Sequence, residues 1–144
     1  MKLLDANLLL YAVNEDAPLH AEAREWLETQ LSGTETIAFC WIVLLAFLRL
    51  STRPLVFANP LEPAQAFSLI ESWLSQPCAT VVYPSERHAS VLKDLLAPLG
   101  TAGNLTTDAH LAALAIEHGA ELCSTDADFS RFAALRWSNP LRGQ

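Results

Sequence analysis

The chain has 144 residues, 51% of them hydrophobic and 17% charged, which is enough for one domain with a buried core. Nine basic residues stand against 16 acidic ones, and the net charge of −7 argues against binding nucleic acid through a broad basic surface. No uncharged apolar run reaches about 18 residues and the N-terminus lacks a signal-peptide pattern, so we expect a cytoplasmic protein with no membrane association.

Hydrophobic periodicity and turn residues predict an alternation of strands and helices. In chain order we expect a strand at 2–4, helices from Asp5 to about Tyr11 and at 18–31, a strand at 35–40, helices at 41–52 and 62–76, a strand at 79–83, helices at 85–100 and 107–118, a strand at 121–124 and a short last strand at 135–137. Such alternation is typical of α/β folds. We therefore predict one domain over residues 1–144, with a short parallel sheet flanked by helices on both faces.

Three aspartates lie where strands end or helices begin. Asp5 follows the first strand, Asp108 begins its helix, and Asp126 follows the next strand. In right-handed β-α-β units these positions share one edge of the sheet, where open α/β folds bind their ligands. Asp108 also precedes Leu111 and Ala115 by three and seven residues, which places it on the inward face of the helix. We therefore expect the three carboxylates to converge.

Carboxylates that meet without a Lys or Arg repel one another, and a divalent cation removes that repulsion. Mg²⁺ suits an all-oxygen site, with Mn²⁺ as a second option, and a metal-activated water can hydrolyse a phosphodiester. Asp5, Asp108 and Asp126 are therefore the candidate metal-binding and catalytic residues. A structural interpretation stays open for each, and for Asp128, as a helix cap or turn residue.

Two segments resemble the PIN-domain family: "LLDANLLLYA" at residues 3–12 and "TDAHLAALAIEHGAELCSTDADF" at residues 107–129. The likeness is closest to the VapC-type ribonuclease toxins of bacterial toxin–antitoxin pairs. Residues 41–54, "WIVLLAFLRLSTRP", are similar to the branch of the family with a Phe-x-Arg helix. The resemblance implies a Mg²⁺-dependent endoribonuclease, usually a homodimer, that cleaves RNA and is held inactive by a cognate antitoxin.

The resemblance also implies individual residues of the site. Asp5 and Asp108 match the main metal ligands, and Asp126 matches a third acidic position. Asn7 and Ser124 match polar positions, and either side chain can orient a carboxylate or a metal-bound water.

The sequence departs from the family on the middle helix. Many PIN domains carry a Glu in the slot that falls here at Ala46 or Phe47. Its absence predicts weaker metal binding, an oxygen supplied by Asp128 instead, or an inactive homologue. Arg49, in the same helix, is interpreted either as the partner of a buried carboxylate or as a contact to the scissile phosphate.

Other classes of protein fit less well. A receiver-like phospho-acceptor needs a Lys past a later strand, and Lys2 and Lys93 are not suitably placed. The serious alternative is a catalytically inactive PIN module that binds a protein partner or RNA. His20, His88 and His118 are interpreted as helix-surface or helix-end residues, and His110 lies nearly opposite Asp108 on its helix and is not expected to be a ligand. Residues 66–74 and the apolar N-terminal helix are interpreted mainly as core faces that could also bury an antitoxin or a second subunit.

Overall fold

The structure, a computed structural model, describes residues 1–141. Five short strands form one sheet in which every neighbouring pair is parallel. They are β1 (Lys2–Leu4), β2 (Ile37–Phe39), β3 (Ala79–Val81), β4 (Glu121–Cys123) and β5 (Trp137–Ser138). The order across the sheet is β3-β2-β1-β4-β5, so β1 lies at the centre. The predicted parallel α/β fold is confirmed, and the last strand begins two residues later than expected. Residues 142–144 of the predicted domain lie outside the described residues.

Six helices connect the strands of the described chain. They are α1 (Ala6–Val13), α2 (His20–Leu31), α3 (Trp41–Ser51), α4 (Pro63–Leu74), α5 (His88–Leu96) and α6 (Thr106–Glu117). The helix expected at 85–100 is shorter than predicted and continues as a 3₁₀ turn at Ala97–Leu99. Pro98 explains the early end, because proline lacks the N–H that an α-helix needs and restricts the residue before it.

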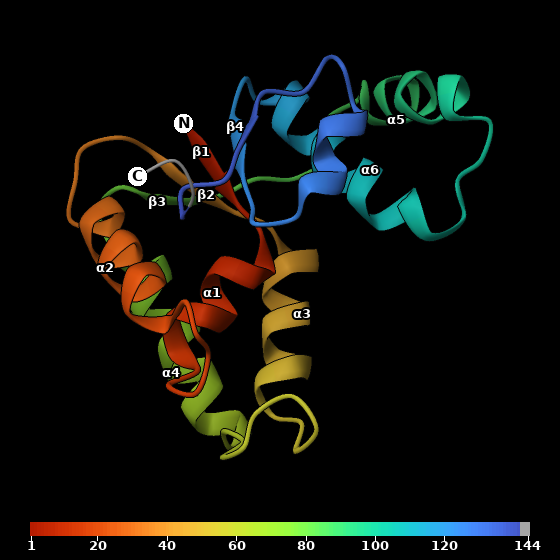
Figure 1. Cartoon of the computed structure of the whole chain (residues 1–144). Helices are drawn as coiled ribbons and strands as arrows, with labels where there is room; N and C mark the ends of the chain where they lie inside the picture. The colour runs from red at the N-terminus through yellow and green to blue at the C-terminus, as the bar shows by residue number, and fades with distance from the viewer. Residues whose placement is uncertain (142–144) are drawn as a thin grey trace.

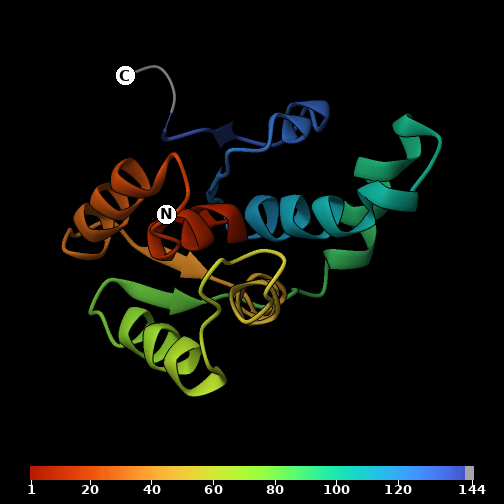
Figure 2. The ribbon, with the colours of Figure 1, turned by 60° about the horizontal axis from the view of Figure 1, so that its bottom comes forward.

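The helices form two groups on opposite sides of the sheet. α1 packs against α2 and α3, and α3 against α4, whereas α5 packs against α6. Figure 1 shows the first group below the sheet and the second at its upper right, and in Figure 2 α5 and α6 extend away from α2 and α4. Right-handed crossovers explain the split, because β1 to β3 step in one direction and the chain then returns across the sheet to β4.

The central strands are buried on both faces. Leu3, Leu4, Ile37, Ala38 and Phe39 have no exposed surface. A parallel sheet covered by helices on both sides requires such continuous apolar strands. The three cysteines are free thiols. Within residues 1–141, no helix combines the length and the apolar character that crossing a membrane requires.

Candidate functional site

The pairing of β1 with β4 brings Asp5 next to Ser124. The two strands run parallel in a register that aligns Leu4 with Cys123, so the residues that follow are neighbours at the carboxyl edge. The Asp5 N–H donates to the Cys123 carbonyl at 3.0 Å, which continues the pairing by one residue. The ends of two strands 119 positions apart in the chain therefore meet, as the sequence predicted.

Asp5 is both a helix cap and a member of the site. Its Oδ1 accepts the Ala6 N–H at 2.7 Å and caps α1. Its Oδ2 accepts the Ser124 hydroxyl at 2.7 Å. Burial raises the pKa of Asp5, outweighing the effect of these two hydrogen bonds. An ionised carboxylate has about four acceptor positions, so this side chain can still bind a cation.

Ser124 is the centre of a small hydrogen-bond network and is completely buried. Besides donating to Asp5, its Oγ accepts the Asn7 side-chain amide and the Asp126 N–H, each at 3.0 Å. The Asn7 amide oxygen accepts the Thr125 N–H at 3.3 Å. Asn7 and Ser124 thus join the loop after β4 to the start of α1 and fix the Asp5 carboxylate.

Asp108 lies in the first turn of α6. Its side chain accepts no hydrogen bond and forms no ion pair with any residue in the range 1–141. Burial is the largest cause that raises the pKa of Asp108, to about 6. The other causes are the charges of three neighbouring carboxylates, Asp126, Asp5 and Asp128. Four aspartates therefore share one electrostatic environment, and Asp108 is not a helix cap.

Asp126 and Asp128 begin the 3₁₀ helix η3 (Ala127–Arg131). Asp126 caps it, because its Oδ1 accepts the Asp128 N–H at 2.9 Å. The Asp128 side chain is 56% exposed and lies 3.7 Å from the Arg131 guanidinium. Asp126 thus points one oxygen into the turn and keeps a second one, while Asp128 behaves as an exposed turn residue.

The donor set fits a hard divalent cation in kind. All four side chains offer oxygen, and in the described chain no Lys or Arg forms an ion pair with Asp5, Asp108 or Asp126. As placed, no three acidic, His or Cys side chains among residues 1–141 are arranged to hold a metal. Binding one ion would therefore require these carboxylates to move closer together, against the repulsion between like charges.

The helix in which many PIN domains carry a Glu corresponds to α3, which contains no acidic residue. Phe47 is fully buried, and its ring packs edge-on against Trp73 with 4.9 Å between the ring centroids. Of the two positions at which the family's Glu could fall, only the half-buried Ala46 is therefore available. Arg49 is exposed and forms no ion pair with residues 1–141, which excludes a pairing with a buried carboxylate there.

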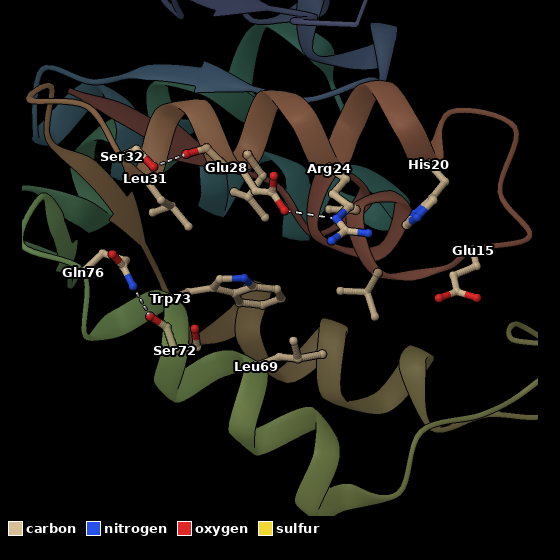
Figure 3. A pocket seen from close by; sticks show the side chains of 13 residues that line it. Glu15, His20, Arg24, Glu28, Leu31, Ser32, Leu69, Ser72, Trp73 and Gln76 are labelled. Carbon is tan, nitrogen blue, oxygen red and sulfur yellow. Dashed lines mark hydrogen bonds and ion pairs between the residues drawn. The ribbon is translucent and has the colours of Figure 1, made fainter.

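A groove away from these aspartates is a second candidate surface. It has a volume of about 450 Å³ and runs between α2 and α4, with Leu27, Leu31, Leu69 and Trp73 among its apolar lining (Figure 3). None of the four aspartates lines it. A groove of this kind suits a docked protein segment better than the hydrolysis of a phosphodiester.

Sequence reasoning missed a second polar cluster, which joins α5 to α6. The His88 ring contacts both Glu117 and His110, although His88 was interpreted as a helix-surface or helix-end residue. One signal was present, since His110 and Glu117 are seven residues apart and so share a face of α6.

Comparison with known proteins agrees with this fold. Residues 2–135 match the family model of the PIN domain. Ribonuclease VapC37 of Mycobacterium tuberculosis is 46% identical over 140 residues, covering 97% of each chain. A chain in the crystal structure of VapBC2 from Rickettsia felis, bound to a promoter DNA fragment, superposes with a TM-score of 0.70 at 23% identity, covering 96% of this chain and 97% of that one. Mycobacterium tuberculosis VapC20, described as a sarcin–ricin loop cleaving toxin, gives a TM-score of 0.63 at 17% identity, covering 94% and 99%.

The chain therefore belongs to the PIN-domain family. Because the similarity to ribonuclease VapC37 extends over nearly the full length of both chains, the protein lies within the VapC branch of that family.

Proposed function

We propose that the protein is a metal-dependent endoribonuclease that acts as the toxin of a toxin–antitoxin pair. The observation that carries this proposal is the group of aspartates at the carboxyl edge, in which Asp108 has no partner among residues 1–141. The similarity to a protein named ribonuclease VapC37 supports RNA as the substrate. The likeness to chains of VapBC complexes supports the pairing with an antitoxin.

Asp5, Asp108 and Asp126 would hold Mg²⁺, or Mn²⁺ in its place. A bound ion would supply positive charge next to the scissile phosphate and an activated water. Asp5 is fixed by Ser124 and by the α1 backbone, so it forms the rigid part of the site. Asp108 is the adaptable part, since nothing in residues 1–141 binds its carboxylate. With a pKa of about 6 it is mostly ionised at pH 7 and can accept a cation.

The missing Glu lowers the negative charge of the site. A methyl group at Ala46 offers no ligand, so more of the ion's coordination is left to water. Mg²⁺ tolerates this, because it commonly keeps several waters and binds through one or two carboxylates. We therefore expect activity that needs a higher Mg²⁺ concentration than a site with a further Glu.

A metal-titrated cleavage assay tests the proposal. The antitoxin-free protein is incubated with labelled single-stranded RNA in EDTA, Mg²⁺ or Mn²⁺. We expect cuts only with the metals, and a loss of at least about a hundredfold in Asp5→Asn, since loss of a metal contact costs several kcal/mol. Asp16→Asn, on an exposed loop, is the matched control.

Two outcomes would count against the enzyme. Equal cleavage by folded Asp5→Asn and wild type would show that the aspartates do not carry the chemistry. RNA binding without cleavage in any metal would identify the inactive PIN module instead.

We also propose a homodimer that forms through the outer face of α3. Trp41 and Leu45 are one turn apart on this helix and are 43% and 53% exposed. Tyr83 is 60% exposed and follows β3 by two residues, as Trp41 follows the neighbouring strand β2. Exposed large apolar side chains of this kind suit burial against a second copy of the chain.

Light scattering during size exclusion tests the dimer. We expect twice the chain mass for the wild type and a monomer for Leu45→Glu, with Leu55→Glu, also exposed, as the control. A wild-type monomer at every concentration would exclude the dimer.

The antitoxin is expected to dock in the groove between α2 and α4 (Figure 3). The apolar lining is flanked by Arg24 and Glu28, which form an ion pair at 3.0 Å, so an amphipathic segment with an apolar stripe fits it. Co-expression with the product of the neighbouring reading frame tests this. We expect co-purification to be lost in Leu69→Arg and kept in Phe67→Arg, which lies on the same helix outside the groove. Failure of the wild type to co-purify would refute the pairing.

A further inference from the structure

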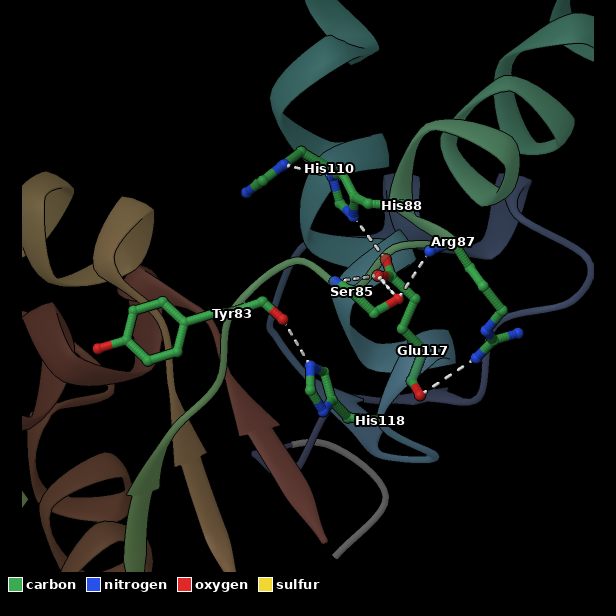
Figure 4. A network of polar contacts seen from close by, with 7 residues as sticks. All are labelled: Tyr83, Ser85, Arg87, His88, His110, Glu117 and His118. Carbon is green, nitrogen blue, oxygen red and sulfur yellow. Dashed lines mark hydrogen bonds and ion pairs between the residues drawn. The ribbon is translucent and has the colours of Figure 1, made fainter.

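A covered carboxylate joins the start of α5 to the end of α6. The Glu117 side chain has no exposed surface. Its Oε1 accepts the N–H and the hydroxyl of Ser85 at 2.8 and 2.6 Å. Its Oε2 accepts from His88 Nδ1 at 2.5 Å, and the carbonyl of Glu117 accepts from Arg87 at 3.3 Å (Figure 4). Because an ionised carboxylate only accepts, Nδ1 of His88 carries the hydrogen.

Two further contacts extend this connection along α6. His88 Nε2 lies 2.9 Å from His110 Nδ1, with the two rings edge to face. The His118 ring meets the Tyr83 carbonyl at 2.7 Å. The segment 83–88 is therefore held to α6 at two levels, about two turns apart.

Apolar packing alone does not determine how α6 is rotated about its axis. Six consecutive or near-consecutive residues of α6 are buried, and four of them are alanines: Ala109, Leu111, Ala112, Ala113, Leu114 and Ala115. A helix with apolar residues on most sides has no single face that must point inward. Small side chains also leave little shape to discriminate one rotation from another.

The loop before α6 does not fix this rotation either. Residues 100–104 are exposed, and Gly100 and Gly103 have positive φ angles of 69° and 41°. Such a connection supplies few contacts that hold the helix start in place.

The polar contacts with α5 do define a rotation. His110 and Glu117 lie on the same face of α6, because seven residues make nearly two full turns. Asp108 precedes His110 by two residues, about 200° around the helix, and so faces away from α5. Holding His110 against His88 therefore turns Asp108 toward the carboxyl edge of the sheet.

We infer that Glu117, His88 and His110 form a positioning network that aims Asp108 at the other aspartates. The inference rests on the proposed metal site and adds three residues that touch neither metal nor RNA. Polar contacts of this kind specify one packing among several of similar energy. Without these contacts the Asp108 side chain would no longer be held in one orientation, so we expect metal affinity to be the first property to change.

Mn²⁺ binding, measured without RNA by electron paramagnetic resonance, tests the inference. Glu117→Gln keeps the size of the side chain but replaces the carboxylate by a neutral amide, so the hydrogen bonds from Ser85 and His88 lose their charge assistance. We expect Mn²⁺ affinity to fall about tenfold, as it does when residues behind a metal ligand are changed. Cleavage at saturating Mn²⁺ should return to within about threefold of wild type. Glu86→Gln, an exposed neighbour outside the network, should bind as the wild type does.

His88→Asn is a milder second variant, in case Glu117→Gln does not fold. Asn can still donate to Glu117 but does not reach His110, and we expect a loss of several-fold in Mn²⁺ affinity. Wild-type affinity in either folded variant overturns the inference. Asp108→Asn separates this failure from that of the metal site: if it binds Mn²⁺ as tightly as the wild type, the site itself is wrong.

Discussion

Asp108 and Glu117 lie nine residues apart on α6, and their carboxylates meet opposite conditions. Glu117 is covered but receives three hydrogen bonds from Ser85 and His88. Burial acts to raise the pKa of Glu117, yet these bonds outweigh it and the pKa lies below its ordinary value. Asp108 receives no such bond from the described chain, and its pKa rises to about 6.

The difference between these two carboxylates lies in the supply of hydrogen-bond donors, because burial acts to raise the pKa of both. At one end of the helix the charge is satisfied and holds two helices together. At the other end it is left among like charges, which opposes folding unless a cation is bound. Sites that bind ions commonly accept such a local cost in stability.

The largest expected effect is the loss of cleavage in Asp108→Asn. The change removes a charge at nearly constant size, so we expect the fold to persist and the rate to fall at least about a hundredfold, or about 2.7 kcal/mol. Asp94→Asn, exposed on α5, is the control. Single-turnover cleavage measures both variants. An unchanged rate in Asp108→Asn would show that Asp108 has no role in cleavage.

Glu117→Gln should show its main effect on stability. Hydrogen bonds to a charged group contribute about 1.5–3 kcal/mol each and bonds between neutral groups about 0.5–1.5 kcal/mol. We therefore expect the free energy of unfolding in urea to drop by about 1–3 kcal/mol when the carboxylate becomes an amide, against almost no change in Glu86→Gln. Equal stability of the two variants would mean that the α5–α6 contacts contribute little.

The two carboxylates also predict opposite dependences on pH in metal-free protein. The raised pKa of Asp108 means that its protonated form favours folding, an effect that is complete below 3.8 and lost as pH rises through about 6. The lowered pKa of Glu117 means that its ionised form favours folding above 4.5 and loses that effect as pH falls through its lower folded value.

Thermal unfolding in EDTA between pH 3 and 8 would separate these effects. We expect Asp108→Asn to be more stable than wild type above pH 6 and to lose this advantage toward pH 4. Glu117→Gln should instead be less stable at pH 7, with the deficit shrinking in acid. Parallel profiles for both variants would contradict the contrast.

Much of the site followed from local rules. The alternation of strands and helices predicted the parallel sheet, and the ends of β1 and β4 bring Asp5 and Asp126 to one edge as expected. These inferences succeed because strand ends and helix starts share an edge whatever the details of packing.

The remaining features depended on how helices pack. The contact of His88 with Glu117 spans 29 positions and exists only because α5 crosses α6 at one particular level. The exposure of Arg49 could not be predicted either, because α3 is apolar on nearly all sides and its sequence does not indicate which face is covered.

The smallest effect is expected at Asp128, the residue that could supply the metal-binding oxygen of the missing Glu. Its side chain is 56% exposed and lies near Arg131, and it is the least of the three charges that raise the pKa of Asp108. Exposed pairs of this kind contribute about 0–1 kcal/mol, so Asp128→Asn should change cleavage by no more than a few-fold. Rates at limiting and saturating Mg²⁺ would show this, with Arg131→Gln as the control for the pair. A loss as large as that of Asp108→Asn, restored by high Mg²⁺, would instead make Asp128 a ligand and bring η3 into the metal site.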